Sequence, residues 1–282
     1  MKGVIVAAGY GTRFLPVTRC LPKEMLPIVD RPSIDFVVDE MVQAGVTKLL
    51  ILTSRRKKVL EDWFDRDAEL DAVFTREGAT AKLAKARPPE VEVTYRRQTE
   101  MRGTGQALLL ARDFAGDDPI VVAYPDDLFH GPSCTGQLVE TWRQTGCSVL
   151  SAHDFSGQDV SRYGVLDAED PVNGVARVKG IVEKPAPGKE PSHLVSLGRY
   201  LFTPEIFPLL EAGLAAHGSG EFYPQDAINL LAAEDKVRAR IVDAERWDTG
   251  VPLGLLKAGI EHALERDDMA DELRNWLKTR LA

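Results

Sequence analysis

The chain has 282 residues, of which 44% are hydrophobic and 28% charged, and it carries a formal net charge of -8 at pH 7. This composition is typical of a soluble globular protein with one sizeable core, and the acidic charge argues against general binding of nucleic acid. The three cysteines form no CxxC pair and the five histidines show no metal-ligand spacing. We therefore expect a cytoplasmic protein without structural zinc. The first apolar run is short and ends in glycines, and no apolar segment reaches 18 residues, so we expect neither export nor membrane insertion.

The chain opens with an apolar run that ends at Ala8, and small or polar residues follow at once. These are Gly9, Gly11, Thr12 and Arg13. Glycine lets a backbone approach a ligand closely and permits the positive φ of a tight turn. The pattern therefore predicts a first strand that runs into a phosphate-binding loop.

Two familiar glycine motifs compete for this loop. A dinucleotide-binding fingerprint needs a third glycine and an immediate helix, but Phe14 follows and the helix is blocked by Pro16, Pro22 and Pro27. A P-loop ends in Gly-Lys-Ser/Thr, whereas residues 11–13 read Gly-Thr-Arg. The sequence thus predicts a long, proline-stiffened loop at the carboxyl end of the first strand, where open α/β sheets bind ligands.

The rest of the first half alternates between helical and strand patterns. Helices are predicted at 32–44, 56–64, 67–86 and 106–114, and strands at 48–53, 91–95 and 120–123. The last of these strands is followed by Asp126 and Asp127. Two carboxylates directly after a strand suit a hard cation such as Mg²⁺, although a turn with a helix cap explains this dipeptide equally well.

The second half has more strands and fewer helices between them. Strands are predicted at 148–153, 163–167, 175–182, 194–202 and 237–242, and helices at 204–214, 223–233, 252–264 and 269–281. Asp248 follows the last strand, which predicts a third carboxylate at the ligand edge. We therefore expect an α/β fold with a mixed, mostly parallel central sheet to which antiparallel strands are added.

Glycines, cations and acids at strand ends suit phosphoryl or nucleotidyl transfer, because there the protein mainly positions groups and offsets charge. No Ser/His/Asp triad or activated cysteine suggests itself instead. On this hypothesis Arg13 and Lys23 hold a polyphosphate, and Asp126 and Asp248 hold Mg²⁺. Lys184 then holds a second anionic substrate. Each residue alone would more often be a solvated surface charge, so the hypothesis depends on their joint placement.

Five stretches carry a resemblance to a known family. They are AAGYGTRFLP at 7–16, PKEMLPIVD at 22–30, YGV at 163–165, VEKP at 182–185 and GRY at 198–200. Together they resemble the sugar nucleotidyltransferases, and among these the bacterial UTP-glucose-1-phosphate uridylyltransferases. The resemblance covers nearly the whole chain and implies a three-layer nucleotide-diphospho-sugar transferase fold.

The resemblance implies that UTP and glucose 1-phosphate give UDP-glucose and pyrophosphate, by in-line attack at the α-phosphorus with Mg²⁺. It implies a homodimer or homotetramer with no nucleic acid or membrane partner. It also implies one nucleotidyltransferase domain over 1–282. Within that domain, 1–147 mainly binds nucleotide, 148–250 mainly binds the sugar phosphate, and 251–282 forms C-terminal helices.

The same resemblance assigns site residues. Those expected at the nucleotide are Ala8, Gly9, Gly11, Thr12, Glu24, Gln98, Gly103 and Asp127. Those expected at the phosphates and the leaving pyrophosphate are Arg13 and Lys23, and those at the metal are Asp126 and Asp248. Those expected at the sugar phosphate are Gly164, Glu183 and Lys184.

Two stretches depart from the uridylyltransferase pattern. Residues 220–228 read GEFYPQDAI where a stretch like GEIQLTDAI is usual, and their aromatic pair is similar to enzymes acting on N-acetylglucosamine 1-phosphate. The WDTG stretch at 247–250 is similar to the thymidylyltransferases. A sister enzyme using another sugar 1-phosphate (N-acetylglucosamine or galactose) or TTP therefore stays open. So does a non-catalytic nucleotide-sugar-binding regulator, although such a module has no need of the metal acids.

Overall fold

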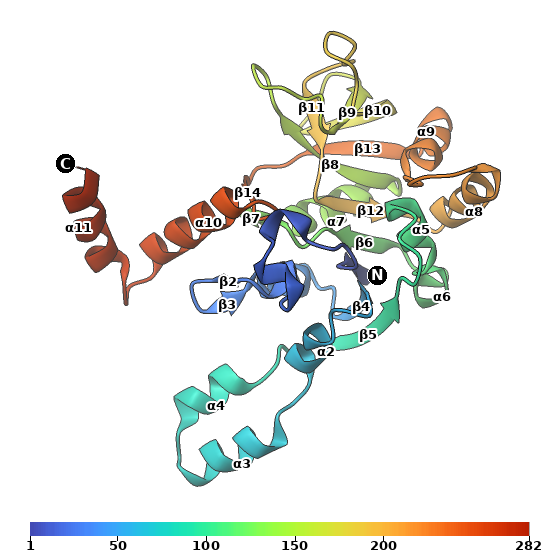
Figure 1. The fold of residues 1–282 in the computed structure, drawn as a ribbon. Coiled ribbons are helices and arrows are strands. Elements are labelled where there is room, and N and C mark those ends of the chain that lie inside the picture. Colours follow the sequence, from blue (N-terminus) through green and yellow to red (C-terminus); the bar gives the residue numbers. More distant parts are fainter. Residues whose placement is uncertain (282) are drawn as a thin grey trace.

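The computed structural model describes residues 1–281, and its centre is a ten-stranded sheet with helices on both faces (Figure 1). The strands are β1 (Lys2–Val6), β4 (Lys48–Thr53), β5 (Glu92–Arg97), β6 (Ile120–Ala123), β8 (Ser148–Asp154), β9 (Gly164–Ala168), β10 (Val175–Glu183), β11 (Leu194–Ser196), β12 (Arg199–Phe202) and β13 (Val237–Ile241). Their order across the sheet is β11-β9-β10-β13-β8-β12-β6-β1-β4-β5.

The four strands of the first half, β5, β4, β1 and β6, are parallel to one another. The second half adds β12 antiparallel to β6, and then β8, β13, β10, β9 and β11, of which only β13 and β8 pair in parallel. The predicted mixed sheet with added antiparallel strands is therefore confirmed. Two small ladders lie outside it, one of β2 (Pro27–Ile28) with β3 (Arg31–Pro32) and one of β7 (Asp127–His130) with β14 (Glu245–Asp248).

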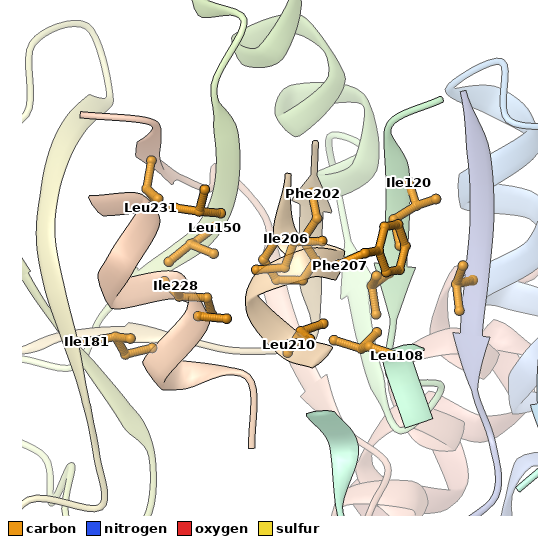
Figure 2. Close-up of a cluster of buried hydrophobic side chains, with 14 of the residues drawn as sticks. Leu108, Ile120, Leu150, Ile181, Phe202, Ile206, Phe207, Leu210, Ile228 and Leu231 are labelled. Carbon is orange, nitrogen blue, oxygen red and sulfur yellow. The ribbon is translucent and has the colours of Figure 1, made fainter. Parts of the chain in front are cut away.

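Residues 1–281 form α-helices, some of which pack on the two faces of the sheet. They are α1 (Ser33–Gln43), α2 (Val59–Phe64), α3 (Ala68–Arg76), α4 (Thr80–Ala86), α5 (Thr104–Leu109), α6 (Arg112–Ala115), α7 (Cys134–Thr145), α8 (Ile206–Ala216), α9 (Gln225–Ala233), α10 (Pro252–Glu265) and α11 (Ala270–Leu281). Side chains of α5, α8 and α9 form one buried cluster with the sheet (Figure 2). Side chains of α1, α2, α7 and α10 form a second cluster.

Strand β4 shows why the sheet is buried on both faces. Its Leu50 and Leu52 belong to the first cluster, whereas Leu49 and Ile51 belong to the second. Successive side chains of a strand point to opposite faces, so a continuous apolar run such as this one requires a layer of helices on each side. The resulting arrangement is the three-layer fold expected from the sequence.

Most predicted elements are present, with ends shifted by a few residues. The strands at 48–53 and 120–123 have the predicted bounds, and the helix predicted at 67–86 is interrupted at Gly78, which has φ +66°. The strand predicted at 194–202 is divided at Gly198, whose φ of +75° turns the chain from β11 to β12. The strands β2, β3, β7 and β14 and the helix α7 were not predicted.

The loop after β1 contains three short 3-10 helices instead of an α-helix. They cover Thr12–Phe14, Val17–Arg19 and Lys23–Met25, and prolines lie between or beside them at positions 16, 22 and 27. The first regular α-helix, α1, begins only at Ser33. This placement agrees with the exclusion of the dinucleotide fingerprint and leaves the loop folded over the sheet edge.

Two parts of the chain extend away from the sheet in Figure 1. One is the pair α3 and α4, and the other is formed by α10 and α11, with the C-terminus at its end. Of the helices within residues 1–281, none combines the length and the apolar character that a membrane span requires.

A buried ion pair joins the helical layer to the sheet. Arg199 on β12 is 0% exposed and donates from Nη2 to Oε2 of Glu40 on α1 at 2.7 Å. Oε1 of Glu40 also accepts from the backbone N and Oγ1 of Thr135, both at 2.6 Å. Nη1 of Arg199 donates to the carbonyl oxygens of Gly198 and Asp127 at 3.0 and 3.2 Å. The pair therefore ties α1, α7 and β12 to the start of β7.

We expect Glu40→Gln to lower the free energy of unfolding by about 3–5 kcal/mol, because it leaves a fully buried guanidinium without its counter-charge. Urea denaturation followed by circular dichroism measures this loss. The control is Glu140→Gln on the exposed face of α7, which should change stability by no more than about 0.5 kcal/mol. Equal stabilities of the two variants would show that the buried pair is not needed for the fold.

Candidate active site

Two cavities adjoin at one edge of the sheet. The first, which we call the N-terminal cavity, has a volume of about 460 Å³ and lies at the carboxyl ends of β1, β5 and β6. The second, the C-terminal cavity, has a volume of about 540 Å³ and lies between the end of β10, the start of β9 and the end of β14. The residues that line both are Thr104, Tyr124, Asp126, Asp127 and Tyr223. The cavities thus meet at the predicted pair of carboxylates.

Nearly all the predicted site residues line one or both cavities. Those at the N-terminal cavity are Ala8, Gly9, Gly11, Thr12, Lys23, Glu24, Gln98, Gly103, Asp126 and Asp127. Those at the C-terminal cavity are Arg13, Asp126, Asp127, Gly164, Glu183 and Asp248. Arg13 and Lys23, predicted to act together, therefore face different cavities.

Lys184 lines neither cavity. Its Nζ lies 3.6 Å from Oε1 of Glu183 and 5.3 Å from the ring centroid of Tyr223, and its side chain is half exposed. Its backbone has a positive φ of 47°, which is uncommon for a residue other than glycine. Lys184 thus stands at the rim of the C-terminal cavity, beside residues that do line it.

Lys23 and Asp126 form a close ion pair at the meeting point. Nζ of Lys23 lies 2.5 Å from Oδ2 of Asp126. Burial works to lower the pKa of Lys23, but the charges of Asp126 and Glu24 outweigh it and raise that pKa. Burial works to raise the pKa of Asp126, but Lys23 outweighs it and lowers that pKa. Both groups are therefore charged at neutral pH and ready to act on ionic ligands.

Asp248 reaches the site through a ladder that the sequence did not predict. We expected it simply to follow the strand at 237–242, but it lies on the separate strand β14, which pairs with β7 so that Asp248 is opposite Asp127. Arg246, two residues earlier, donates from Nε to Oδ1 of Asp127 at 2.5 Å, and its Nη2 lies 3.6 Å from Oδ2 of Asp248. Alternation along a strand places residues two apart on one face, so this spacing could have indicated Arg246.

The environment of Asp127 differs from that of Asp126. Burial raises the pKa of Asp127 to about 6, although Arg246 works in the opposite direction. For Arg246, burial works to lower the pKa, but the charges of Asp127 and Asp248 outweigh it and raise that pKa. Arg246 thus remains cationic and offsets the charge of two neighbouring carboxylates.

The positions of Asp126 and Asp248 suit a divalent cation. A Cβ added to Gly250 would lie 2.8 Å from Oδ2 of Asp126 and 3.1 Å from Oδ1 of Asp248, so both oxygens face the same point. The backbone N and Oγ1 of Thr249 donate to the carbonyl oxygen of Asp126 at 2.9 and 3.0 Å and hold the two segments together. Carboxylate oxygens are the ligands that Mg²⁺ prefers.

Within residues 1–281 no group of three or more His, Cys, Asp or Glu side chains is arranged to hold a metal by itself. Two carboxylates completed by substrate phosphates and water are nevertheless the usual donor set of Mg²⁺. The residues present therefore fit such an ion.

Glu24 is held by a lysine that the sequence analysis missed. Glu24 is 1% exposed and Lys57 is 4% exposed, and Nζ of Lys57 donates to both carboxylate oxygens at 2.8 and 2.7 Å. Burial lowers the pKa of Lys57 more than Glu24 raises it. In the sequence Lys57 stands in the basic run 55–58, which reads as a solvated surface. Only the fold shows that it is buried against Glu24, which lines the N-terminal cavity.

Gln98 and Gly103 are linked on the other side of this cavity. Nε2 of Gln98 donates to the carbonyl oxygen of Gly103 at 3.2 Å and to Oε1 of Gln106 at 2.7 Å. Gly103 has φ +95°, and a Cβ there would lie 2.4 Å from the carbonyl oxygen of Phe222. Glycine is therefore required at this position, because any side chain would displace the segment that closes the cavity.

Several further residues line the C-terminal cavity without having been predicted. They are Arg162, Tyr163, Ser196, Tyr200, Tyr223, Gln225 and Arg246. Tyr163 and Tyr200 lie in the YGV and GRY stretches, and Tyr223 and Gln225 lie in the stretch that departs from the uridylyltransferase pattern, but these stretches do not identify which side chains line a cavity. They come from β11, β12, β14, α9 and the turns before β9 and α9, which only the fold brings together.

Known proteins resemble the whole chain. A family model described as nucleotidyl transferase matches residues 2–263. UTP-glucose-1-phosphate uridylyltransferase 2 of Staphylococcus saprophyticus is 39% identical over 280 residues, which are 98% of this chain and 96% of that protein. The UTP-glucose-1-phosphate uridylyltransferase of Staphylococcus epidermidis is 37% identical over 280 residues, which are 98% of this chain and 97% of that protein.

Solved structures agree. The UTP-bound UGPase of Acinetobacter baumannii has a TM-score of 0.89 and 32% identity, covering 98% of each chain. A UDP-glucose pyrophosphorylase complexed with UDP-glucose has a TM-score of 0.80 and 34% identity, covering 94% of this chain and 99% of that one. Because the similarity in sequence and structure extends over almost its full length, this chain belongs to the nucleotidyl transferase family.

Proposed function

We propose that the chain is a UTP-glucose-1-phosphate uridylyltransferase, which makes UDP-glucose and pyrophosphate from UTP and glucose 1-phosphate. The observation that carries the proposal is the meeting of two cavities at Asp126 and Asp127, with Lys23 on one side and Arg246 on the other. One cavity accommodates each substrate, and the two substrates contact each other where carboxylates and cations are concentrated.

The N-terminal cavity is the proposed UTP site. Gln98 and Gly103 would contact the uracil together with Ala8 and Gly9, whose small size leaves room for the base against the strand end. Glu24 would accept a hydrogen bond from the nucleoside, and its orientation is fixed by the buried Lys57. Gly11 and Thr12 would lie along the phosphates. These roles are supported by the cavity's position at the carboxyl ends of parallel strands.

The C-terminal cavity is the proposed glucose 1-phosphate site. Glu183 and Gly164 would contact sugar hydroxyls, and Lys184 at the rim would bind the sugar phosphate. The N-terminal residues 1–147 then contribute mainly to the nucleotide site and residues 148–250 mainly to the sugar site. Asp248 crosses this division, since β14 brings it back to β7.

The reaction needs two polyanions to approach closely. An oxygen of the sugar phosphate attacks the α-phosphorus of UTP, a new O–P bond forms, and the bond to the pyrophosphate breaks in line with it. Lys23 and Arg13 offset the charge of the phosphates and of the departing pyrophosphate in a site with little water. Asp126 and Asp248 would hold Mg²⁺. The chemistry that this ion supplies when bound is neutralisation and polarisation of the phosphate oxygens.

The proposal extends to assembly and location. The apolar side chains exposed along α10 and α11 are Leu253, Leu256, Trp276 and Leu281. They support a subunit contact in a homodimer or homotetramer, because large apolar side chains are exposed on two consecutive helices. A reaction that consumes UTP would take place in the cytoplasm, where the nucleotide is made.

The first test is pyrophosphate release by the purified chain with Mg²⁺, using five nucleoside triphosphates each paired with the 1-phosphates of glucose, galactose, mannose and N-acetylglucosamine. We expect a maximum for UTP with glucose 1-phosphate. A maximum for TTP or for another sugar would keep the fold and the metal site but identify a sister enzyme. No release with any pair would favour a binding module.

The second test is Asp248→Asn. We expect an unchanged fold and a fall in kcat of about 100- to 1000-fold, because removing one preorganised electrostatic contact in a dry site has effects of that size. Asp243→Asn, an exposed carboxylate just before β14, is the matched control and should keep full activity. Full activity of Asp248→Asn at saturating Mg²⁺ would remove Asp248 from the metal site.

A further inference from the structure

Residues 220–228, where the sequence departs from the usual pattern, form a wall shared by the two cavities. The backbone N of Phe222 donates to the carbonyl oxygen of Arg102 at 2.7 Å, and its carbonyl oxygen accepts from the backbone N of Gly105 at 2.9 Å. Phe222 itself is buried. Tyr223 lines both cavities and Gln225 lines the C-terminal one. This segment is therefore fixed to the nucleotide side through its backbone, while the side chain of Gln225 lines the sugar side and that of Tyr223 lines both.

Gln225 contacts the residue proposed to bind the sugar. Its Nε2 donates to Oε2 of Glu183 at 2.7 Å. The amide oxygen, Oε1, is buried and has no partner within residues 1–281. A buried polar atom without a partner destabilises a protein, so this amide is poorly explained by stability. Its one side-chain hydrogen bond in this part of the chain is the bond to Glu183.

A second bond one helical turn later makes the position of Gln225 rigid. Oδ1 of Asn229 accepts from the backbone N of Ile181 at 2.7 Å, and its Nδ2 donates to the carbonyl oxygen of Ile181 at 3.2 Å. Gln225 and Asn229 are four apart on α9 and therefore share a face, while Ile181 and Glu183 are two apart on β10 and share a face. Helix α9 is thus joined to strand β10 at two points, the backbone of Ile181 and the carboxylate of Glu183.

The neighbours of Glu183 leave its carboxylate free to accept hydrogen bonds from a ligand in the C-terminal cavity. Gln225 donates to Oε2, and the Lys184 ammonium lies 3.6 Å from Oε1. A Cβ on Gly164 would lie 3.3 Å from Oε2, so the absence of a side chain there keeps the carboxylate open to the cavity. With donors from the protein on both oxygens, the remaining lone pairs can only accept, and sugar hydroxyls are the donors that a sugar phosphate brings.

We propose that Gln225 is a positioning residue that sets recognition of the sugar, by holding Glu183 in the orientation that accepts hydrogen bonds from hexose hydroxyls. The proposal rests on the proposed function, because it assigns the sugar of the same substrate pair to the C-terminal cavity. It predicts that Gln225 affects binding of the sugar and not of the nucleotide, although its segment also borders the nucleotide site.

The test compares two ligands that share a nucleotide. Calorimetry would measure the dissociation constants of UDP-glucose and of UMP for the wild type, Gln225→Met and Gln225→Glu. Gln225→Met keeps the length of the side chain and removes the donor. We expect it to weaken UDP-glucose about tenfold, the usual effect of losing a hydrogen bond to a charged group, and to leave UMP unchanged. Gln225→Glu should weaken UDP-glucose further, since it sets two carboxylates against each other.

Steady-state kinetics gives a second readout. The KM for glucose 1-phosphate should rise in both variants while the KM for UTP stays constant. Asp226→Asn, the exposed neighbour on the same helix, is the matched control and should match the wild type in every measurement. Equal affinities of wild type and Gln225→Met for UDP-glucose would overturn the proposal. So would a parallel loss of UMP binding, because it would indicate damage to the shared wall.

The outcome can be separated from that of the proposed function. If the wild type prefers another UDP-sugar, the choice of glucose is wrong, and the same comparison with that UDP-sugar still tests Gln225. If the wild type binds no UDP-sugar more tightly than UMP, the C-terminal cavity does not bind sugar and the proposal is overturned.

Discussion

The arrangement of this molecule depends on bringing carboxylates from distant parts of the chain to one point without mutual repulsion. Asp126 follows β6, Asp248 ends β14, and both face the space beside Gly250. The negative charge of each carboxylate is offset before any ligand binds. Lys23 pairs with Asp126, and Arg246 lies close to Asp248. Because Lys23 and Arg246 are mostly buried, they attract these carboxylates more strongly than they would in water and so reduce the repulsion between Asp126 and Asp248. A substrate phosphate or a metal ion then exchanges partners with charges that are already in place.

The buried layer behind the site keeps this geometry rigid. Arg199 binds Glu40 in the helical layer and also donates to the carbonyl oxygen of Asp127, so the core contacts the backbone of the site directly. Gly198, the residue before Arg199, has a positive φ, and a Cβ there would lie 2.6 Å from Cβ of Asp127. The GRY stretch therefore supports the site from behind. Its glycine leaves room for Asp127, and its arginine binds the carbonyl oxygen of Asp127.

The features that could be predicted from the sequence are those that a local pattern of residues determines. Apolar runs such as 48–53 and 120–123 define strands, and the ends of parallel strands meet at one edge, so Asp126 and Lys23 could be placed near each other from the letters alone. The ladder between β7 and β14 could not, because its strands are short, mixed in polarity and far apart in the chain. Lys57 and Gln225 were missed for a related reason. Their burial and partners arise from tertiary packing, which neither the basic run around Lys57 nor the unusual stretch around Gln225 specifies.

Because the two cavities have largely separate walls, specificity for one substrate can change without a change in specificity for the other. The nucleotide wall is built from loops after β1 and β5, whereas the sugar wall is built from β10 and the start of α9. Substitutions on one wall can alter recognition of one substrate while the metal acids between them stay as they are. Thr104, Tyr124 and Tyr223 line both cavities, as the two aspartates do, so a substitution at one of these positions can affect both substrates. The unusual composition of residues 220–228 therefore bears on the sugar side through Gln225 and Glu183, and on the nucleotide side through Glu221 and Tyr223.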